Sequence, residues 1–150
     1  MTLDASGRAA MTATIGYDSV KVGDELPRLV IGPLTRQDIV QYAGGACDFS
    51  PLHYDQPFVE AAGLPTVVAM GMFTAGMASR CITDFAGAGQ VRNYKVRFVA
   101  RIYPGDTIAC TGRVTRKFEA DDERMIEGEL IVTNQKGEVA LTGSFRVALG

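Results

Sequence analysis

One change of hydrophobic period constrains the fold of this chain more than any other feature. Over residues 71–85, large apolar side chains recur at helical spacing, and alanine, glycine and serine fill many of the positions between them. The large residues are Phe73, Met77, Cys81 and Phe85. From Val91 onward the apolar period becomes two, which is typical of a strand with one buried face. Because small residues let neighbours pack closely, the pattern predicts a buried central helix beside a sheet.

The other elements follow from the same patterns and from turn residues. Strands are expected from Val91 to Ile102 and at residues 107–117, 125–134 and 139–149, with hairpin tips at 119–123 and 135–137. Before the central helix we expect a short strand at 28–34, a helix from Thr35 to Gly44–Gly45, an ordered loop at 47–55 and a short helix at 56–62. Thr35 and Asp38 have the spacing of a capping box. This order is an α+β layout with antiparallel strands.

The length and composition suit one ordinary globular domain. A chain of 150 residues can build one core, so we expect a single domain over residues 16–150, preceded by a flexible N-terminal arm over residues 1–15. No apolar run approaches the roughly 20 residues that cross a bilayer, and no charged-then-apolar leader opens the chain. A net charge of -2 does not favour nucleic acid or anionic membrane as a partner. We therefore expect a cytoplasmic protein that binds neither.

Two further features bear on bound groups and on assembly. The three cysteines, Cys47, Cys81 and Cys110, are far apart and lack a Cys-x-x-Cys pair, so neither a disulfide framework nor a zinc site is expected. No glycine-rich phosphate loop occurs, and we expect no metal and no bound cofactor. Because one long helix covers little of a sheet, exposed strand edges and the apolar run at residues 64–68 favour pairing with a second copy. We expect a homodimer, with a higher oligomer or a heterodimer as alternatives.

The loop from Cys47 to Asp55 is the chemically richest segment. His53 is the only histidine of the chain, and Asp48 precedes it by five positions in a stretch that contains Pro51. A carboxylate and an imidazole that share one water can move protons near neutral pH, because histidine titrates at about pH 6.5. Addition of water to a conjugated double bond needs such a pair. The spacing is equally compatible with a structural role, in which Asp48 caps the turn and backbone groups satisfy the His53 ring.

The residues around this pair resemble a known family. The hydratase motif of the MaoC-like, or (R)-specific enoyl-CoA hydratase, family is similar to the run YAGGACDFSPLHYD at residues 42–55, followed by residues 58–63 and by Met70-Gly71-Met72. The similarity extends from about Tyr17 to the C-terminus. The resemblance implies the hotdog fold, in which a curved antiparallel sheet wraps around a long central helix.

The resemblance also implies roles for the matching residues. Asp48 and His53 would form the catalytic pair that orients and activates water for attack on the β-carbon of an enoyl thioester. The N–H of Gly71, at the start of the central helix, would hold the thioester carbonyl. This role agrees with the free N–H groups and positive dipole end of a helix start, which stabilise developing enolate charge.

The loop departs from the family pattern at three positions. Ser50 stands where asparagine is usual, and together with Pro51 it would order the loop, although serine reaches less far. Cys47 replaces the usual glycine before the aspartate, and Met70 stands where histidine often precedes the glycine. A nucleophilic role for Cys47 is disfavoured, because the adjacent carboxylate opposes thiolate formation.

The resemblance predicts reversible hydration of a trans-2-enoyl thioester, on coenzyme A or acyl carrier protein, to the (R)-3-hydroxyacyl form. Two alternatives stay open, a hotdog acyl-CoA thioesterase and a non-catalytic or partner-dependent acyl-binding subunit of a heteromeric hydratase. The methionines Met70, Met72 and Met77 are expected in the core or in the wall of an acyl tunnel. A basic row indicates a solvated strand face or, at a dimer rim, a contact to coenzyme A phosphates; its members are Arg92, Lys95, Arg97 and Arg101.

Overall fold

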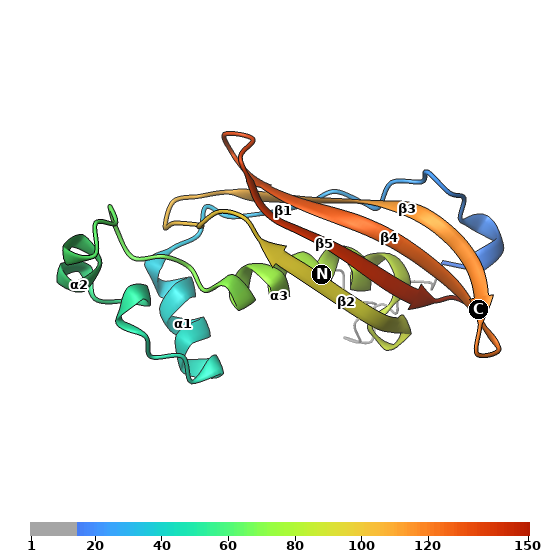
Figure 1. The fold of residues 1–150 in the computed structure, drawn as a ribbon, viewed down its shortest axis with the longest axis horizontal. Coiled ribbons are helices and arrows are strands. Elements are labelled where there is room, and N and C mark those ends of the chain that lie inside the picture. The colour runs from blue at the N-terminus through green and yellow to red at the C-terminus, as the bar shows by residue number, and fades with distance from the viewer. Residues whose placement is uncertain (1–14) are drawn as a thin grey trace, which may run out of the picture.

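Five strands form one antiparallel sheet that curves over a long helix in the computed structural model, which describes residues 15–150 (Figure 1). The strands are β1 (Leu29–Ile31), β2 (Val91–Phe98), β3 (Ile108–Ala120), β4 (Glu123–Asn134) and β5 (Val139–Ala148), in the spatial order β1-β3-β4-β5-β2. The helices are α1 (Arg36–Ala46), α2 (Gln56–Ala61) and α3 (Gly71–Ala86). The predicted α+β arrangement is therefore confirmed. Apart from Ile15, the N-terminal arm expected over residues 1–15 lies outside the described residues.

Helix α3 presents small and medium side chains where it is most deeply buried. Thr74, Ala78 and Ile82 are 4%, 0% and 1% exposed. Phe73 and Phe85, the two ends of the predicted apolar stripe, are only half-buried. Met77 and Cys81, in the middle of the stripe, are 8% and 2% exposed, so the buried face of α3 joins the middle of the stripe to the small residues beside it.

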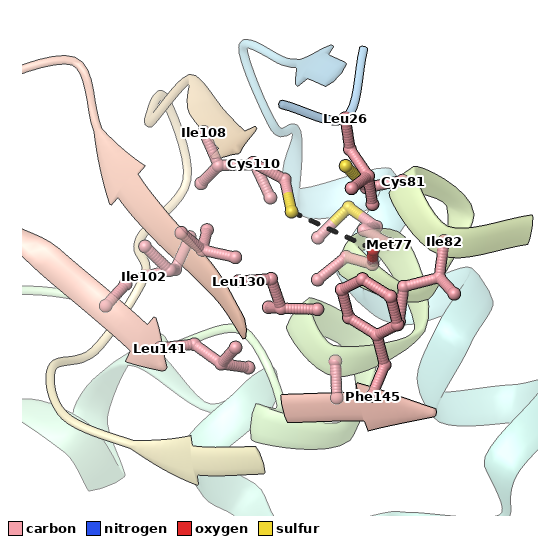
Figure 2. Packing of buried hydrophobic residues seen from close by; sticks show 14 of the residues in the cluster. Leu26, Met77, Cys81, Ile82, Ile102, Ile108, Cys110, Leu130, Leu141 and Phe145 are labelled. Carbon is pink, nitrogen blue, oxygen red and sulfur yellow. Dashed lines mark hydrogen bonds between the residues drawn. The ribbon is translucent and has the colours of Figure 1, made fainter. Parts of the chain in front are cut away.

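Figure 2 shows the apolar side chains that fill the space between α3 and the sheet. The largest fully buried ones among them are Phe145, Ile82, Ile108, Leu130 and Leu141. The three cysteines are free, and the thiol of Cys110 in β3 donates a hydrogen bond to the carbonyl of Ala78 in α3 at 3.8 Å. Contact with Cys81 and burial raise the pKa of the Cys110 thiol, so this side chain acts as a small neutral hydrophobe.

Strand β2 is shorter than the sequence predicts, because it ends at Phe98 instead of Ile102. The N–H groups of Val99 and Ala100 both donate to the carbonyl of Ala140, at 2.9 and 3.2 Å, so the regular ladder stops there. Phe98 is 49% exposed in consequence, although the alternation places it on the buried face.

Strand β1 is also shorter than the expected run at residues 28–34. Gly32 has φ 125°, a conformation that favours glycine, and it turns the chain out of the sheet. Leu34 then donates its N–H to the carbonyl of Asp106 at 2.8 Å, outside the β1–β3 ladder.

A lateral segment, defined as residues 35–70, carries α1 and α2 and projects from one end of α3 (Figure 1). The predicted capping box is present, since the Thr35 hydroxyl accepts from the N–H of Asp38 and the Asp38 carboxylate accepts from the N–H of Thr35. Helix α1 passes through Gly44–Gly45, where we expected it to stop, and continues to Ala46. Cys47, in the left-handed conformation with φ 52°, ends it.

The apolar run at residues 64–68 is partly buried within the single chain. Val67 and Val68 are 1% and 6% exposed, and the run lies between α2 and α3 in the chain without forming a strand. Within residues 15–150, the sheet edges without a neighbouring strand are those of β1 and β2. No helix in this part of the chain has the length and apolar character needed to cross a membrane.

Candidate active site

The fold brings Asp48 and His53 together in the lateral segment. Nε2 of His53 lies 3.6 Å from Oδ2 of Asp48. The His53 side chain is 11% exposed and that of Asp48 is 44% exposed, so the imidazole is withdrawn from solvent while the carboxylate reaches it. Because the separation exceeds that of a good hydrogen bond, the two facing atoms can both bind a third group placed between them.

A backbone carbonyl sets the orientation of the His53 ring. Nδ1 lies 2.7 Å from the carbonyl oxygen of Val68. A carbonyl oxygen only accepts hydrogen bonds, so Nδ1 carries the hydrogen and, in the neutral ring, Nε2 carries the lone pair. Nε2 is therefore the atom that faces Asp48 and can take up a proton.

Main-chain hydrogen bonds tie this loop to the chain that leads into α3. The 3-10 turn Pro51–His53 closes with a bond from the N–H of His53 to the carbonyl of Ser50, at 3.1 Å. Val68 donates its N–H to the carbonyl of Leu52 at 3.1 Å and accepts from the His53 ring through its own carbonyl. One residue thus holds both the backbone of the turn and the imidazole.

Asp48 makes the turn-capping hydrogen bond that the sequence allowed, and its other carboxylate oxygen faces His53. Its N–H donates to the carbonyl of Ala43 in α1 at 3.0 Å, and its Oδ1 accepts from the N–H of Ser50 at 3.3 Å. Its other oxygen, Oδ2, is the one that faces His53. Ser50 contributes main-chain groups to this arrangement, and no hydrogen bond of its hydroxyl is found within residues 15–150.

Gly71 lies at the exposed start of α3, after Met70, whose side chain does not cap the helix. No acceptor for the Gly71 N–H is found within the described part of the chain. A Cβ at this position would lie 3.0 Å from Cε1 of Phe98, so the ring of Phe98 rests directly on the glycine. The segment from Val68 to Gly71 connects the residue that orients His53 to this helix start.

A shallow depression of about 250 Å³ adjoins Gly71. Its walls come from the start of α3, from the end of β2 and the residues after it, and from β5. The lining residues are Ala69, Gly71, Thr74, Phe98, Ala100, Arg101, Ile102 and Ala140. The depression is mainly apolar, and Thr74 and Arg101 are the residues of its lining that have polar side chains.

Several residues near the site were not found by sequence reasoning. The rings of Tyr42 and Phe73 stack at 4.7 Å between α1 and the first turn of α3, and the helical positions of both were the only signal for this contact. The carbonyl of Val68 left no signal, since every residue has one. Phe98 was expected in the core, and its position over Gly71 follows from the early end of β2.

The remaining candidate residues divide by burial. Met70 and Met77 are buried, and Met72 is 61% exposed. Cys47 is exposed beside Asp48.

Arg92, the first of the basic row, forms an ion pair with Glu123 at 2.6 Å, and this contact raises the pKa of Arg92 and lowers that of Glu123. Within residues 15–150, no three histidine, cysteine or acidic side chains lie close enough together to hold a metal ion.

The chain is similar to a known protein family and to several proteins of known name. The family described as the MaoC like domain matches residues 19–136. The beta subunit of a fatty acid synthase from Aspergillus oryzae is 29% identical over 122 residues, which are 71% of this chain and 6% of that protein. An (R)-specific enoyl-CoA hydratase from Rhodospirillum rubrum is 31% identical over 84 residues, 55% of this chain and 58% of that protein. The chain thus spans less than two thirds of either relative.

A solved structure is similar over nearly its whole length. The X-ray structure of a monoamine oxidase regulatory protein from Archaeoglobus superposes with a TM-score of 0.80 at 27% identity, and the match covers 91% of this chain and 94% of that one. The likeness confirms the predicted hotdog fold.

Proposed function

The chain belongs to the family of MaoC-like domains, and we propose that it is a hydratase that reversibly adds water to a trans-2-enoyl thioester and yields the (R)-3-hydroxyacyl thioester. The reverse reaction is the dehydration. The names of the two relatives support a substrate of this class, because one is an enoyl-CoA hydratase and the other belongs to fatty acid synthesis. The carrier is coenzyme A or acyl carrier protein.

The observation that carries the proposal is the fixed orientation of His53 toward Asp48. With Nδ1 held by the Val68 carbonyl, Nε2 and Oδ2 of Asp48 face each other at 3.6 Å. A water bound by both atoms has its oxygen oriented and one proton directed at a base. Attack of this oxygen on the β-carbon forms the C–O bond and moves the π electrons toward the thioester carbonyl.

The reaction needs two proton transfers, and Asp48 and His53 together account for both. One proton leaves the attacking water for a group of the pair, and one is delivered to the α-carbon, so that the product has gained one water. A carboxylate and an imidazole suit this exchange because one group can hold a proton while the other releases one. Between the two transfers the negative charge lies on the thioester oxygen as an enolate.

In this proposal, the N–H of Gly71 is the donor that stabilises that charge. Its N–H belongs to the uncapped first turn of α3, where the helix dipole is positive. A donor aimed at the developing oxyanion contributes more in the transition state than in the ground state. The absence of a Cβ makes room for the ring of Phe98, which lies against the glycine.

We extend the proposal to a homodimer of single domains that pairs through the open edge of β2. The end of this strand exposes Phe98 and Val99, at 49% and 55%, and Met72 in the first turn of α3 is exposed as well. An unpaired strand edge beside exposed apolar side chains favours association with a second copy. Pairing there covers the surface next to the Gly71 depression.

A second candidate is an acyl-binding subunit that is active only with a different partner chain. The observation that favours it is the departure of Ser50 and Cys47 from the family motif, because Ser50 enters the hydrogen bonds of the loop through its main-chain groups and not through its side chain. A hotdog thioesterase is the third reading, and it does not require His53 to face Asp48.

An assay of enoyl thioester absorbance separates these readings. Purified protein is incubated with crotonyl-CoA and with longer and branched trans-2-enoyl-CoAs, and free thiol is measured in parallel. The hydratase is expected to remove the enoyl absorbance without releasing thiol, and both Asp48→Asn and His53→Ala are expected to slow this by roughly 100-fold or more. Thiol release indicates the thioesterase, and inactivity until a partner chain is added indicates the subunit.

Asp84→Asn is the matched control, because Asp84 lies on the exposed surface of α3 with its side chain 57% exposed. Equal loss of hydration in this variant would contradict a specific role of Asp48.

A further inference from the structure

The members of the basic row, which lie close together in the sequence, point to different surfaces in the fold. The hydroxyl of Tyr94 donates to the carbonyl of Ala75 in α3 at 2.9 Å, so Tyr94 lies on the helix side of β2. Strand alternation therefore places Lys95 and Arg97 on the opposite face. Arg101, beyond the end of the strand, is the member of the row that lines the depression beside Gly71.

Backbone hydrogen bonds fix the chain on both sides of Arg101. Ala69, just before α3, donates its N–H to the carbonyl of Ile102 at 2.8 Å. Ala100 donates its N–H to the carbonyl of Ala140 in β5 at 3.2 Å. The short segment that carries Arg101 is therefore held against the start of α3. The backbone of Arg101 is fixed there by hydrogen bonds on both sides.

The charge of Arg101 has no counterpart within residues 15–150. Arg80, Arg92, Arg124 and Arg146 each face a carboxylate of the same chain. Arg101 takes part in no ion pair or side-chain hydrogen bond in this part of the chain, and no acidic residue lines the depression. The dipole of α3 adds positive potential at the same place. A guanidinium in such a setting suits an oxyanion that arrives with a ligand.

We propose that Arg101 binds an anionic group of the thioester substrate and thereby sets a preference for substrates that carry one. The inference rests on the proposed function, because the thioester is placed at Gly71. Two parts of a substrate supply such a group, namely a phosphate of the coenzyme A or phosphopantetheine arm and a carboxylate at the far end of a short acyl chain. Both present oxygens that a guanidinium can hold in a bidentate manner.

Binding of saturated thioesters tests the site without relying on hydration. Butyryl and glutaryl groups are each attached to coenzyme A and to pantetheine, which gives every combination of carboxylate and phosphate. None of the four has a double bond to hydrate, so their dissociation constants are measured by titration calorimetry on the intact protein. The proteins compared are the wild type, Arg101→Gln, Arg101→Lys and Arg97→Gln.

The wild type is expected to bind the thioester with the preferred anion most tightly, and Arg101→Gln to weaken that binding by roughly tenfold or more. Loss confined to the two coenzyme A thioesters identifies a phosphate, and loss confined to the two glutaryl thioesters identifies a carboxylate. Arg101→Lys is expected to keep part of the preference, since it keeps the charge but not the planar fork. Arg97→Gln is expected to bind like the wild type, because Arg97 lies on the other face of β2.

Three results overturn the inference. They are equal affinities of the wild type and Arg101→Gln for all four compounds, equal losses that include the uncharged butyryl-pantetheine, and no binding by the wild type. Hydration of crotonyl-CoA is measured in the same preparations. If binding depends on Arg101 while hydration is absent, the proposed function fails and the anion site remains, so the two outcomes are distinguishable.

Discussion

The sheet with α3 and the lateral segment of residues 35–70 are held together in different ways. The sheet and α3 enclose fully buried side chains such as Phe145, Ile126 and Leu141, each at most 1% exposed. The lateral segment has some buried residues but exposes the rings of Phe49, Tyr54 and Phe58 at 64%, 51% and 45%. Its loop depends on caps and on hydrogen bonds to backbone groups.

The difference separates stability from reactivity. Close packing makes the sheet region sensitive to the volume of a single methyl group. A half-exposed carboxylate in the lateral segment contributes little to folding, so its chemistry can be changed while the fold persists. The four substitutions below test this contrast, in order of expected effect.

Asp48→Asn is expected to lower kcat/KM for crotonyl-CoA hydration by roughly 10²–10⁴-fold, because the amide cannot exchange a proton. The melting temperature is expected to change little, since the amide oxygen still accepts from the N–H of Ser50. Steady-state kinetics and thermal unfolding of the same preparation check both parts. A large fall in melting temperature would show that Asp48 supports the fold as much as the reaction.

Gly128→Ala is expected to lower the free energy of unfolding by about 3 kcal/mol. The added Cβ would lie 2.3 Å from the Phe145 ring and 2.7 Å from the carbonyl of Arg113, and the backbone atom has little room to move. Gly76→Ala in α3 is the matched control, since its Cβ would meet nothing within 4 Å, and it is expected to stabilise the helix slightly. Urea unfolding of the two variants measures the difference, and similar values would contradict the packing argument.

Thr35→Ala is expected to cost about 1 kcal/mol, because it removes the cap of α1. Bonds from Thr35 lower the pKa of Asp38, so their contribution to stability is present above the ordinary carboxyl pKa and is lost as the pH falls. The wild type should therefore lose more stability than the variant on acidification. Unfolding curves at pH 7 and in the acid range measure this, with Gln37→Ala on the exposed side of the same helix turn as the control.

Tyr94→Phe is expected to cost about 1 kcal/mol at neutral pH through the lost bond to Ala75. Burial and then the nearby Cys110 and Cys81 sulfurs raise the pKa of Tyr94 to about 12. The folded protein thus keeps the phenol proton where the unfolded chain releases it, above a pKa of about 10, so this stability is complete below that pH and declines toward pH 12. Alkaline unfolding should be less steep in the variant, whereas Tyr54→Phe at an exposed position should match the wild type.

The elements predicted well were those whose signal is local. The spacing of apolar residues predicted α3 and the three long strands to within a few residues, because burial of one face repeats along each element. The errors lie where a distant residue decides. The early end of β2 coincides with two hydrogen bonds to the Ala140 carbonyl, and the early end of β1 with the turn at Gly32 and the bond from Leu34 to Asp106.

The candidate site shows the same division. The motif identified Asp48, His53 and Gly71 as residues to examine, and it could do so because residue types and short spacings are properties of the sequence. The hydrogen bond of the Val68 carbonyl to His53, the ring of Phe98 over Gly71 and the place of Arg101 in the lining of the depression could not be predicted in that way. Each depends on which backbone segments lie side by side.

The sequence by itself determined the class of fold, the central helix and the residues able to exchange protons. It could do so because hydrophobic periodicity and residue chemistry are properties of short stretches of sequence. Only the tertiary structure decided which nitrogen of His53 faces Asp48 and which basic residue of the row lies beside the helix start. The physical reason is that a hydrogen bond, or the lack of a counter-charge, depends on which other groups the fold brings close. The partner that orients His53, the carbonyl of Val68, lies 15 residues further along the chain.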